Sequence, residues 1–343
     1  MDFKQTYSFD DVLLEPKFSD INSRWAVNVD SNLDDTHLLK LPVISSPMDT
    51  VTEGNMAVAM ATAGGLGIIH RYNNIEDQVS IVVDSLSRNT TMVAAAAVGV
   101  TGDYHERANA LYDAGATVLC VDVAHGHHSL VKDAMYSIRD SLGKKVHLMV
   151  GNVATLEAFD ALAGWGADSI RVGIGGGSIC STRMVSGHGV PTFQSILECS
   201  RTTYDTKIIA DGGIKTTGDM VKALAAGADF VMVGSMLAGT KETPGETFVG
   251  KEQKKYKVYR GMASSAAQKS WRGKSSTPEG VSTTVPYRGS VKNLLEDIAG
   301  GIRSGLSYSG ARNLEELRGK ASFIRQTNAS QLESKTHILW RNK

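Results

Sequence analysis

Short apolar runs alternate along this chain with segments of helical spacing, and that alternation restricts the fold more than any other feature. We interpret eight of the runs as strands, at residues 41–45, 67–70, 93–98, 117–121, 146–150, 169–172, 207–210 and 230–233. The clearest predicted helices between them lie at residues 106–114, 129–141, 155–165 and 217–226. Strands that alternate with helices pair in parallel through right-handed crossovers. Eight such units in 343 residues predict an α/β fold, the (β/α)₈ TIM barrel.

The ends of the predicted helices support this interpretation. Three of them stop at a glycine that is followed by alanine, at Gly115, Gly166 and Gly227. Glycine readily adopts the left-handed conformation that ends a helix. An open Rossmann-like sheet is the alternative, but no Gly-x-Gly-x-x-Gly motif follows the first strand. Helical spacing returns at residues 291–318, and we expect that segment to close the barrel.

Distinctive residues follow the predicted strands, at the barrel end where active sites form. They include Ser46 to Asp49, His70 to Tyr72, Asp122 to His128, Asn152, the loop containing Cys180, Asp211 to Gly213, and Gly234 with Ser235. The glycine N–H groups after the seventh and eighth strands are suited to bind a phosphate. The Asp211 carboxylate could accept hydrogen bonds from ribose hydroxyls.

Cys180 is a candidate nucleophile because a glycine-rich loop presents its thiol two residues before the hydroxyl of Thr182. A lone cysteine is otherwise often a small buried hydrophobe. Cys120 fits that description, since it lies in an apolar run, and Cys199 lies in a helical stretch. Three cysteines without a spacing pattern argue against a disulfide framework and favour a reducing compartment.

The balance of charge and the lengths of the apolar runs limit which partners the protein can bind. Lysine plus arginine and aspartate plus glutamate both number 36, so no overall field favours nucleic acid or an anionic membrane. Without a signal-peptide core or a membrane-length apolar run, we expect a soluble, cytoplasmic protein.

Residues 242–290 form a polar stretch typical of a functional lid or a surface insertion, and Glu279 is the carboxylate near its end. We expect the basic run 251–257 to be a solvated hairpin.

Several motifs together resemble those of the IMP dehydrogenase and GMP reductase family. Residues 171–182 resemble its signature loop, and further matches lie, in the family's order, at 7–14, 46–51, 151–153, 210–214 and 259–262. The resemblance covers nearly the whole chain. It implies a single catalytic (β/α)₈ barrel over residues 1–343 without an inserted regulatory domain, a mobile flap at about residues 251–285, and a homotetramer. It also implies a purine nucleoside monophosphate as substrate and a nicotinamide cofactor.

The same resemblance assigns roles to individual residues. Cys180 would attack purine C2, with Thr182 as its proton-transfer partner and Glu279 beside the base as a further catalytic group. Substrate-binding positions would be Ser46, Met48, Asn152, Ser178, Asp211, Gly213, Gly234, Ser235, Tyr259, Gly261 and Met262. Asp122 and Arg71 would face the cofactor. The carbonyls of Gly175, Gly177 and Cys180 would bind a monovalent cation, K⁺.

The direction of the reaction depends on the flap. GMP reductase converts GMP and NADPH to IMP, ammonia and NADP, whereas IMP dehydrogenase converts IMP, NAD and water to XMP and NADH. We favour the reductase because residues 263–277 lack the Arg-Tyr pair that activates water in most dehydrogenases. The alternative remains dehydrogenase, since residues 122–127 and 333–337 resemble that branch and Arg272 could activate water. An inactive nucleotide-binding barrel is a third hypothesis, disfavoured by the intact Cys180 and Thr182.

Overall fold

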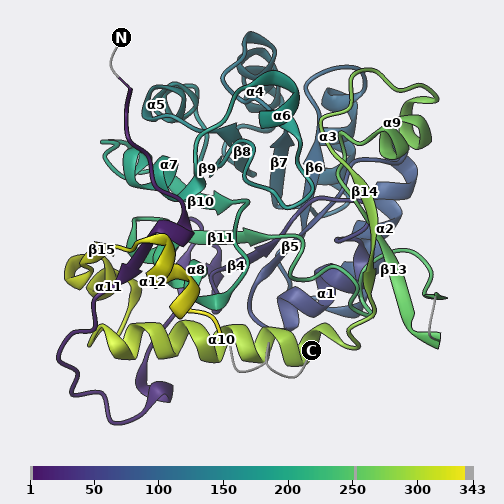
Figure 1. The fold of residues 1–343 in the computed structure, drawn as a ribbon. Coiled ribbons are helices and arrows are strands. Elements are labelled where there is room, and N and C mark those ends of the chain that lie inside the picture. Colours follow the sequence, from purple (N-terminus) through teal and green to yellow (C-terminus); the bar gives the residue numbers. More distant parts are fainter. Residues whose placement is uncertain (1–2, 251–252, 337–343) are drawn as a thin grey trace.

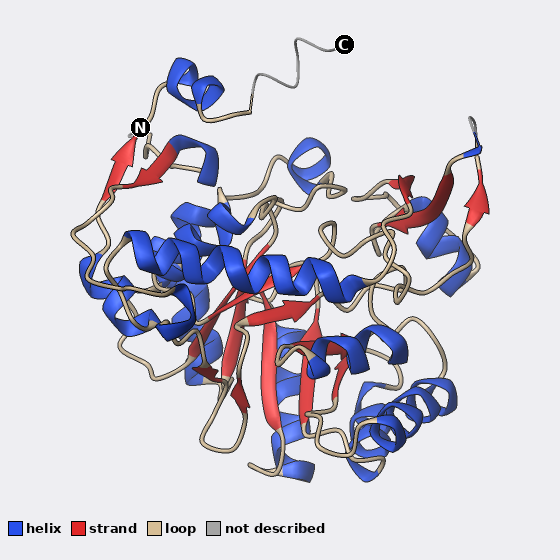
Figure 2. Cartoon of the chain, turned by 90° about the horizontal axis from the view of Figure 1, so that it is seen from below, coloured by secondary structure: helices blue, strands red, loops and turns tan. Residues whose placement is uncertain are grey.

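Eight parallel strands form a closed barrel at the centre of the molecule. The computed structural model describes residues 3–250 and 253–336. Around the barrel the order is β10–β11–β4–β5–β6–β7–β8–β9, and β9 pairs with β10 to close it. The bounds are β4 Val43–Ser45, β5 Leu66–Ile69, β6 Ala95–Val98, β7 Val118–Asp122, β8 His147–Val153, β9 Ser169–Val172, β10 Lys207–Asp211 and β11 Phe230–Val233. In Figure 2 the strands lie among surrounding helices. The predicted (β/α)₈ barrel is confirmed.

Helices connect the strands, as the alternation predicted. Their bounds are α1 Gly54–Thr62, α2 Ile75–Arg88, α3 Tyr104–Asp113, α4 Ser129–Leu142, α5 Leu156–Gly164, α6 Thr182–Ser186, α7 Thr192–Cys199 and α8 Thr217–Ala225. The local sequence explains the ends of α8. Thr216 and Asp219 form a capping box at its start, and Gly227 follows its end with a φ of +118°.

Residues after β11 complete the helical ring. The long helix α10, Val291–Tyr308, packs against α8 and α1, and α11, Leu314–Lys320, packs against α8. Figure 1 shows α10 running along one side of the barrel. This confirms the prediction that residues 291–318 return to helix and close the structure.

The two ends of the described chain meet on the surface. Strand β1, Val12–Leu14, pairs antiparallel with β15, Phe323–Arg325. The short elements η1 Phe9–Asp11 and α12 Asn328–Glu333 lie beside them, whereas η2 Arg24–Ala26 packs against α10. Figure 1 shows the purple N-terminal segment beside the yellow β15 and α12. Sequence periodicity alone does not indicate this pairing, because the partners are far apart along the chain.

The interior of the barrel is packed with apolar side chains. Inward-facing residues include Ile44, Ile68, Met149 and Phe230, all essentially inaccessible to solvent. Leu33 and Leu39 join this inner cluster from the hairpin formed by β2, Ser31–Asn32, and β3, Leu38–Leu39. A second and larger core lies between the strands and the helices. Barrel interiors filled in this way leave the loops at the strand ends as the place for a site.

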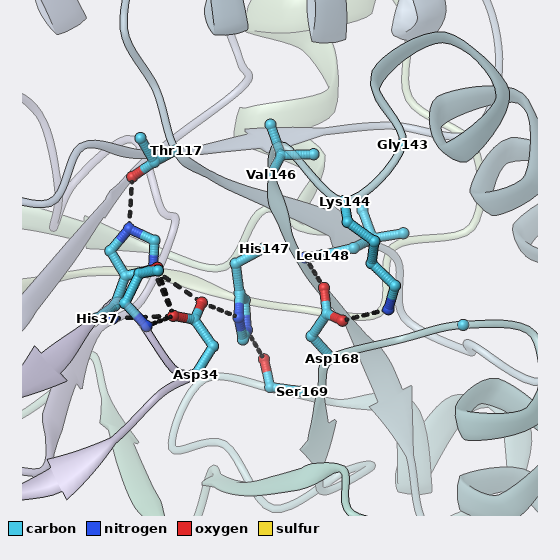
Figure 3. A network of polar contacts seen from close by, with 12 residues as sticks. Asp34, His37, Thr117, Gly143, Lys144, Val146, His147, Leu148, Asp168 and Ser169 are labelled. Atoms are coloured by element: carbon cyan, nitrogen blue, oxygen red, sulfur yellow. Dashed lines mark hydrogen bonds and ion pairs between the residues drawn. The ribbon is translucent and has the colours of Figure 1, made fainter.

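A polar network joins the β2–β3 hairpin to the N-terminal ends of the strands (Figure 3). The Asp34 carboxylate contacts the Nδ1 atoms of His37 and His147, each at 2.8 Å. The other ring nitrogens reach Thr117 Oγ1 at 3.0 Å and Ser169 Oγ at 2.8 Å. Burial alone would raise the pKa of Asp34, but hydrogen bonds from the two histidines hold it well below its usual range.

The polar stretch 242–290 folds into a small sheet and one helix. Strands β12 Phe248–Val249, β13 Lys255–Arg260 and β14 Ser282–Pro286 are antiparallel, and α9 spans Ser265–Arg272. The expected hairpin is present, although Lys251 and Glu252 lie outside the described residues. The expectation of a wholly solvated hairpin is wrong for Lys257. Its side chain is buried and donates to the carbonyls of Thr240 and Thr243, because it points inward from β13.

No helix within the described ranges has both the length and the apolar character that crossing a bilayer requires.

Candidate active site

One cavity of about 490 Å³ opens at the C-terminal ends of the barrel strands. Every residue to which the sequence resemblance assigns a catalytic, substrate, cofactor or cation role lines it. These residues come from the C-terminal ends of seven barrel strands and the loops after them, and from β13 and the segment that follows it. The predicted site residues are therefore brought together in space, although their individual roles rest on further argument.

Glycines allow two loops of the site to lie against each other. A side chain at Gly173, where φ is +148°, would place its Cβ 1.9 Å from the carbonyl oxygen of Asp211. At Gly212, with φ at +90°, a Cβ would lie 3.1 Å from the backbone nitrogen of Gly177. Only glycine fits such positions without displacing the backbone. The loop after β9 and the loop after β10 thus form one wall.

Cys180 is exposed in this cavity and lies beside a hydroxyl. Its Sγ is 3.2 Å from Thr182 Oγ1. The segment after α9 holds the loop in place, because Ser181 N–H donates to the Glu279 carbonyl at 3.0 Å and Val281 N–H donates to the Ile179 carbonyl at 3.0 Å. The backbone of Glu279 is therefore attached directly to the loop that carries the thiol.

Arg171 is a site residue that sequence reasoning did not single out. Its buried guanidinium donates to Asp122 Oδ1 at 2.5 Å and to Asp211 Oδ2 at 2.9 Å. Asn152 Nδ2 also donates to Asp211 Oδ2, at 2.9 Å. Burial alone would lower the pKa of Arg171, whereas the two carboxylates help to raise it above its usual value. The sequence signal that could have identified Arg171 is a charged residue within an otherwise buried strand.

The opposite side of the cavity surrounds Gly234. A Cβ there would lie 3.2 Å from Met48 Sδ and 3.3 Å from both Ser46 Oγ and Tyr259 Oη. Ser178 and Ser235 line the same cavity and add two further hydroxyls to that of Tyr259. Burial raises the pKa of Tyr259, so its hydroxyl stays protonated near neutral pH. Hydroxyls and glycine N–H groups together suit a phosphate.

An ion pair joins two loops at this rim. Arg260 Nε donates to Asp49 Oδ2 at 3.0 Å, and its Nη2 also donates to that carboxylate at 2.5 Å. Asp49 N–H lies 3.4 Å from Met262 Sδ. The pair therefore positions the backbone around Tyr259 and Met262 relative to the loop after β4.

Helix α9 lies within the segment predicted to form a flap and covers another part of the cavity, although sequence reasoning did not single out its lining residues Gln268 and Trp271. Trp271 packs edge-on against Tyr72, with ring centroids 5.7 Å apart. The Gln268 side chain donates to the Ala263 carbonyl at 3.0 Å and accepts from Ser276 N–H at 2.8 Å. Arg272 lines the cavity from the end of the same helix.

The site has groups that fit a nicotinamide cofactor and a cation. Asn152 Oδ1 is buried without a hydrogen-bond partner in the described structure, so it is an acceptor for a ligand amide or hydroxyl. Gly175 and Gly177 present peptide carbonyls, which are neutral oxygen donors suited to a hard cation. The Gly177 carbonyl accepts from Cys180 N–H at 3.2 Å and retains a second lone pair.

A family model confirms what the motifs indicated. The model described as IMP dehydrogenase / GMP reductase domain matches residues 6–337. The match covers the barrel, the Cys180 loop and the segment through α9.

Both IMP dehydrogenases and GMP reductases are similar to the chain over nearly their whole length. Inosine-5'-monophosphate dehydrogenase from Nitrosopumilus maritimus is 34% identical, covering 98% of this chain and 99% of the relative. GMP reductase from Leishmania major is 33% identical, with 96% of each covered. A crystal structure of a GMP reductase variant from Trypanosoma brucei, in complex with guanosine 5'-monophosphate, superposes with a TM-score of 0.92. It is 31% identical and covers 98% of each chain.

Proposed function

The chain belongs to the IMP dehydrogenase / GMP reductase family of oxidoreductases, and from that premise we propose that it is a GMP reductase. It would convert GMP and NADPH, with two protons, to IMP, NADP⁺ and ammonium. Its substrate would be a purine nucleoside monophosphate, as in the Trypanosoma brucei complex. The ribose would lie at Asp211 and the phosphate at Gly213, Ser178, Ser235 and Tyr259.

One observation carries the choice of direction. The Cys180–Thr182 pair is bordered by a segment whose end, Glu279, is hydrogen-bonded through its backbone to the Cys180 loop. Residues 263–277 contain no tyrosine, and Arg272 is their one arginine. A dehydrogenase must activate water, whereas a reductase needs only a proton donor for the departing amine. Thr182 lies beside Cys180 and Glu279 lines the same cavity, and we propose these two residues as that donor.

Each residue of the proposed site has its own role in the reaction. Cys180 adds as a thiolate to C2 of the purine, forming a C–S bond while the electron pair of the C2–N3 π bond moves to N3, which makes C2 tetrahedral. Thr182 and Glu279 supply the proton with which the 2-amino group leaves as ammonia, and C2 remains as a thioimidate on Cys180. After reduction at C2 the C–S bond breaks and its electron pair returns to sulfur. Tyr259 and the glycine loops hold the nucleotide throughout.

The nicotinamide cofactor, when bound, supplies the hydride for that reduction. Asp122 and Arg71 would hold it, with the Asn152 amide between cofactor and substrate. Arg171 keeps Asp122 and Asp211 in fixed positions, so one guanidinium supports both ligands. We propose K⁺ at the carbonyls of Gly175, Gly177 and Cys180, where it would order the loop that presents the thiol.

Two assays test the direction. GMP with NADPH, and separately IMP with NAD, are incubated with the protein while the absorbance of the reduced nicotinamide is followed. We expect absorbance to fall in the first mixture and ammonium to form in equal amount. Formation of NADH from IMP, without consumption of NADPH on GMP, would contradict the reductase assignment.

IMP dehydrogenase is the second candidate because Arg272 lines the cavity that contains Cys180. An arginine there could activate water for hydrolysis of the thioimidate. In that case the Arg272→Ala variant would still release NADH in a single turnover from IMP but would accumulate the covalent adduct. Mass spectrometry of the intact protein would detect the adduct.

A further inference from the structure

Lys257 is a buried cation that has no part in the proposed chemistry. Only 3% of its surface is exposed, although it belongs to the hairpin strand β13. Its ammonium donates to the carbonyl oxygens of Thr240, at 3.4 Å, and of Thr243. Within residues 3–250 and 253–336 it forms no ion pair. Burying an ammonium without a carboxylate partner is costly, so its charge points to a role of its own.

The carboxylate whose charge acts on Lys257 does not pair with it. That carboxylate is Glu242, which accepts hydrogen bonds from Ser290 Oγ at 2.9 Å and from Val291 N–H at 2.8 Å, at the start of α10. The direct partners of the ammonium are therefore neutral carbonyl oxygens. Its positive charge is only partly offset, and a buried charge acts on its surroundings more strongly than an exposed one.

Two chain segments link Lys257 to the proposed phosphate site. On β13 it lies two residues before Tyr259 and on the same buried face, since Val258 between them is exposed. The carbonyls that it binds follow the turn that begins at Gly234, whose carbonyl accepts from Leu237 N–H at 3.0 Å. The Lys257 side chain therefore attaches β13 to the loop after β11.

The proposed phosphate site has no cation of its own. Its donors are neutral groups of Gly213, Ser178, Ser235 and Tyr259. A nucleotide phosphate carries about 1.5 to 2 negative charges near pH 7. Arg171 and Arg260 are already paired with carboxylates. Arg288 donates to the Met236 carbonyl at 3.0 Å, but it is exposed, so its charge is screened. Lys257 remains as the buried positive charge attached to this loop.

We propose that Lys257 is a positioning residue for phosphate recognition. It holds the loop after β11 against β13 and supplies, without contact, positive charge that offsets the 5′-phosphate of the nucleotide. The inference rests on the proposed function only in placing that phosphate beside Ser235 and Tyr259. Lys257 should therefore strengthen the binding of a nucleoside monophosphate but not that of the nucleoside.

Isothermal titration calorimetry tests this by comparing IMP with inosine, which lacks the phosphate. IMP takes part in both the reductase and the dehydrogenase reaction, so the result does not depend on the direction. We expect Lys257→Met to weaken IMP binding at least about tenfold and to change inosine binding less than about twofold, because the lost attraction acts on the phosphate alone. Lys257→Arg, which keeps the charge, should bind IMP more tightly than Lys257→Met.

Lys255→Met is the matched control, since it removes the same charge from an exposed position of the same strand. An unchanged IMP affinity in Lys257→Met, or an equal loss in Lys255→Met, would overturn the proposal. So would equal losses for IMP and inosine, which would show that Lys257 only supports the fold. A protein that reduces GMP while Lys257→Met binds IMP normally would retain the proposed function and lose this inference.

Discussion

The three thiols of this chain differ in the environment that each side chain occupies. Cys180 is exposed beside Thr182, whereas Cys120 lies within the barrel and Cys199 at the end of α7. Burial raises the pKa of Cys120 and of Cys199 to about 12. A thiol with such a pKa stays protonated at neutral pH and is a poor nucleophile. At the scale of single residues, the reactivity of each thiol therefore follows the exposure of its side chain.

Alkylation should modify one cysteine in the native protein. With iodoacetamide at pH 8 we expect labelling of Cys180 alone, because the two buried thiols remain protonated well above that pH. Bound GMP should protect Cys180, and urea should expose all three cysteines. Peptide mapping by mass spectrometry measures the sites. Labelling of Cys199 at the rate of Cys180 in the native protein would contradict this account.

Removing the proposed nucleophile, the Cys180 thiol, should separate the chemical step from GMP binding. We expect Cys180→Ala to lower kcat for GMP reduction by at least about 10³-fold, with the affinity for GMP nearly unchanged. Thr182→Ala should lower kcat by about 10²-fold or more, the usual contribution of a proton-transfer partner. Stopped-flow kinetics and calorimetric titration of GMP measure the two effects. A large loss of GMP affinity in both variants would instead indicate a structural role for the loop.

At the scale of elements, the ion pair between Asp49 and Arg260 connects the loop after β4 to strand β13. Breaking one side leaves a partly buried charge without its partner, so we expect Asp49→Ala and Arg260→Ala each to cost about 2 kcal/mol of unfolding free energy. The double variant should cost less than the sum of the two. Urea unfolding of the four proteins measures the coupling. Additive losses would show that the two residues act independently.

Helix α9 shows how an element outside the barrel can change a site. Its capping residue, Ser264, accepts from Ala267 N–H, and Gly273 ends it with a φ of +72°. These local signals build the helix, but its position depends on Trp271 packing against Tyr72. That contact places Arg272 in the lining of the cavity that contains Cys180. We propose that this helix belongs to the mobile flap, as the family resemblance implies.

At the scale of the whole molecule, the two ends of the barrel have different roles. The C-terminal ends of the strands carry the cavity, and the N-terminal ends are closed by the β2–β3 hairpin and the Asp34 network (Figure 3). In barrels of this type the second end contributes stability rather than chemistry. A substitution there should change unfolding without changing turnover.

Asp34→Asn tests this division. The folded-state pKa of Asp34 lies below its unfolded value of about 3.9, so the carboxylate stabilises the protein above that pH, and the contribution is lost as pH falls toward the folded value. We expect a loss of about 2 kcal/mol at pH 7 that shrinks below about pH 4, with kcat unchanged. Urea unfolding across pH measures it. The exposed neighbour supplies the control: Asp35→Asn should have an effect within about 0.5 kcal/mol, and an equal loss there would contradict the prediction.

Much of the barrel was predictable because its elements are encoded locally. The strands at residues 169–172 and 230–233 agree with β9 and β11 at both ends. The glycine loops were equally visible, since the need for positive φ is a local property. The burial of Lys257 was not predictable, because its amine bonds to carbonyls 14 and 17 residues away. The Asp34–His147 contact spans 113 residues and had no signal in the periodicity.

By itself, therefore, the sequence determined the alternation of strand and helix, the family, and the glycine-rich loop that presents Cys180 as the candidate nucleophile. Periodicity, glycine positions and motif order are local properties of the chain, so they can be identified without a structure. Only the tertiary structure decided that Glu279 is attached to the Cys180 loop, that Arg171 joins Asp122 to Asp211, and that Arg272 lines the cavity that contains Cys180. Each of these depends on contacts between distant segments, whose geometry is set by closure of the barrel and by side-chain packing.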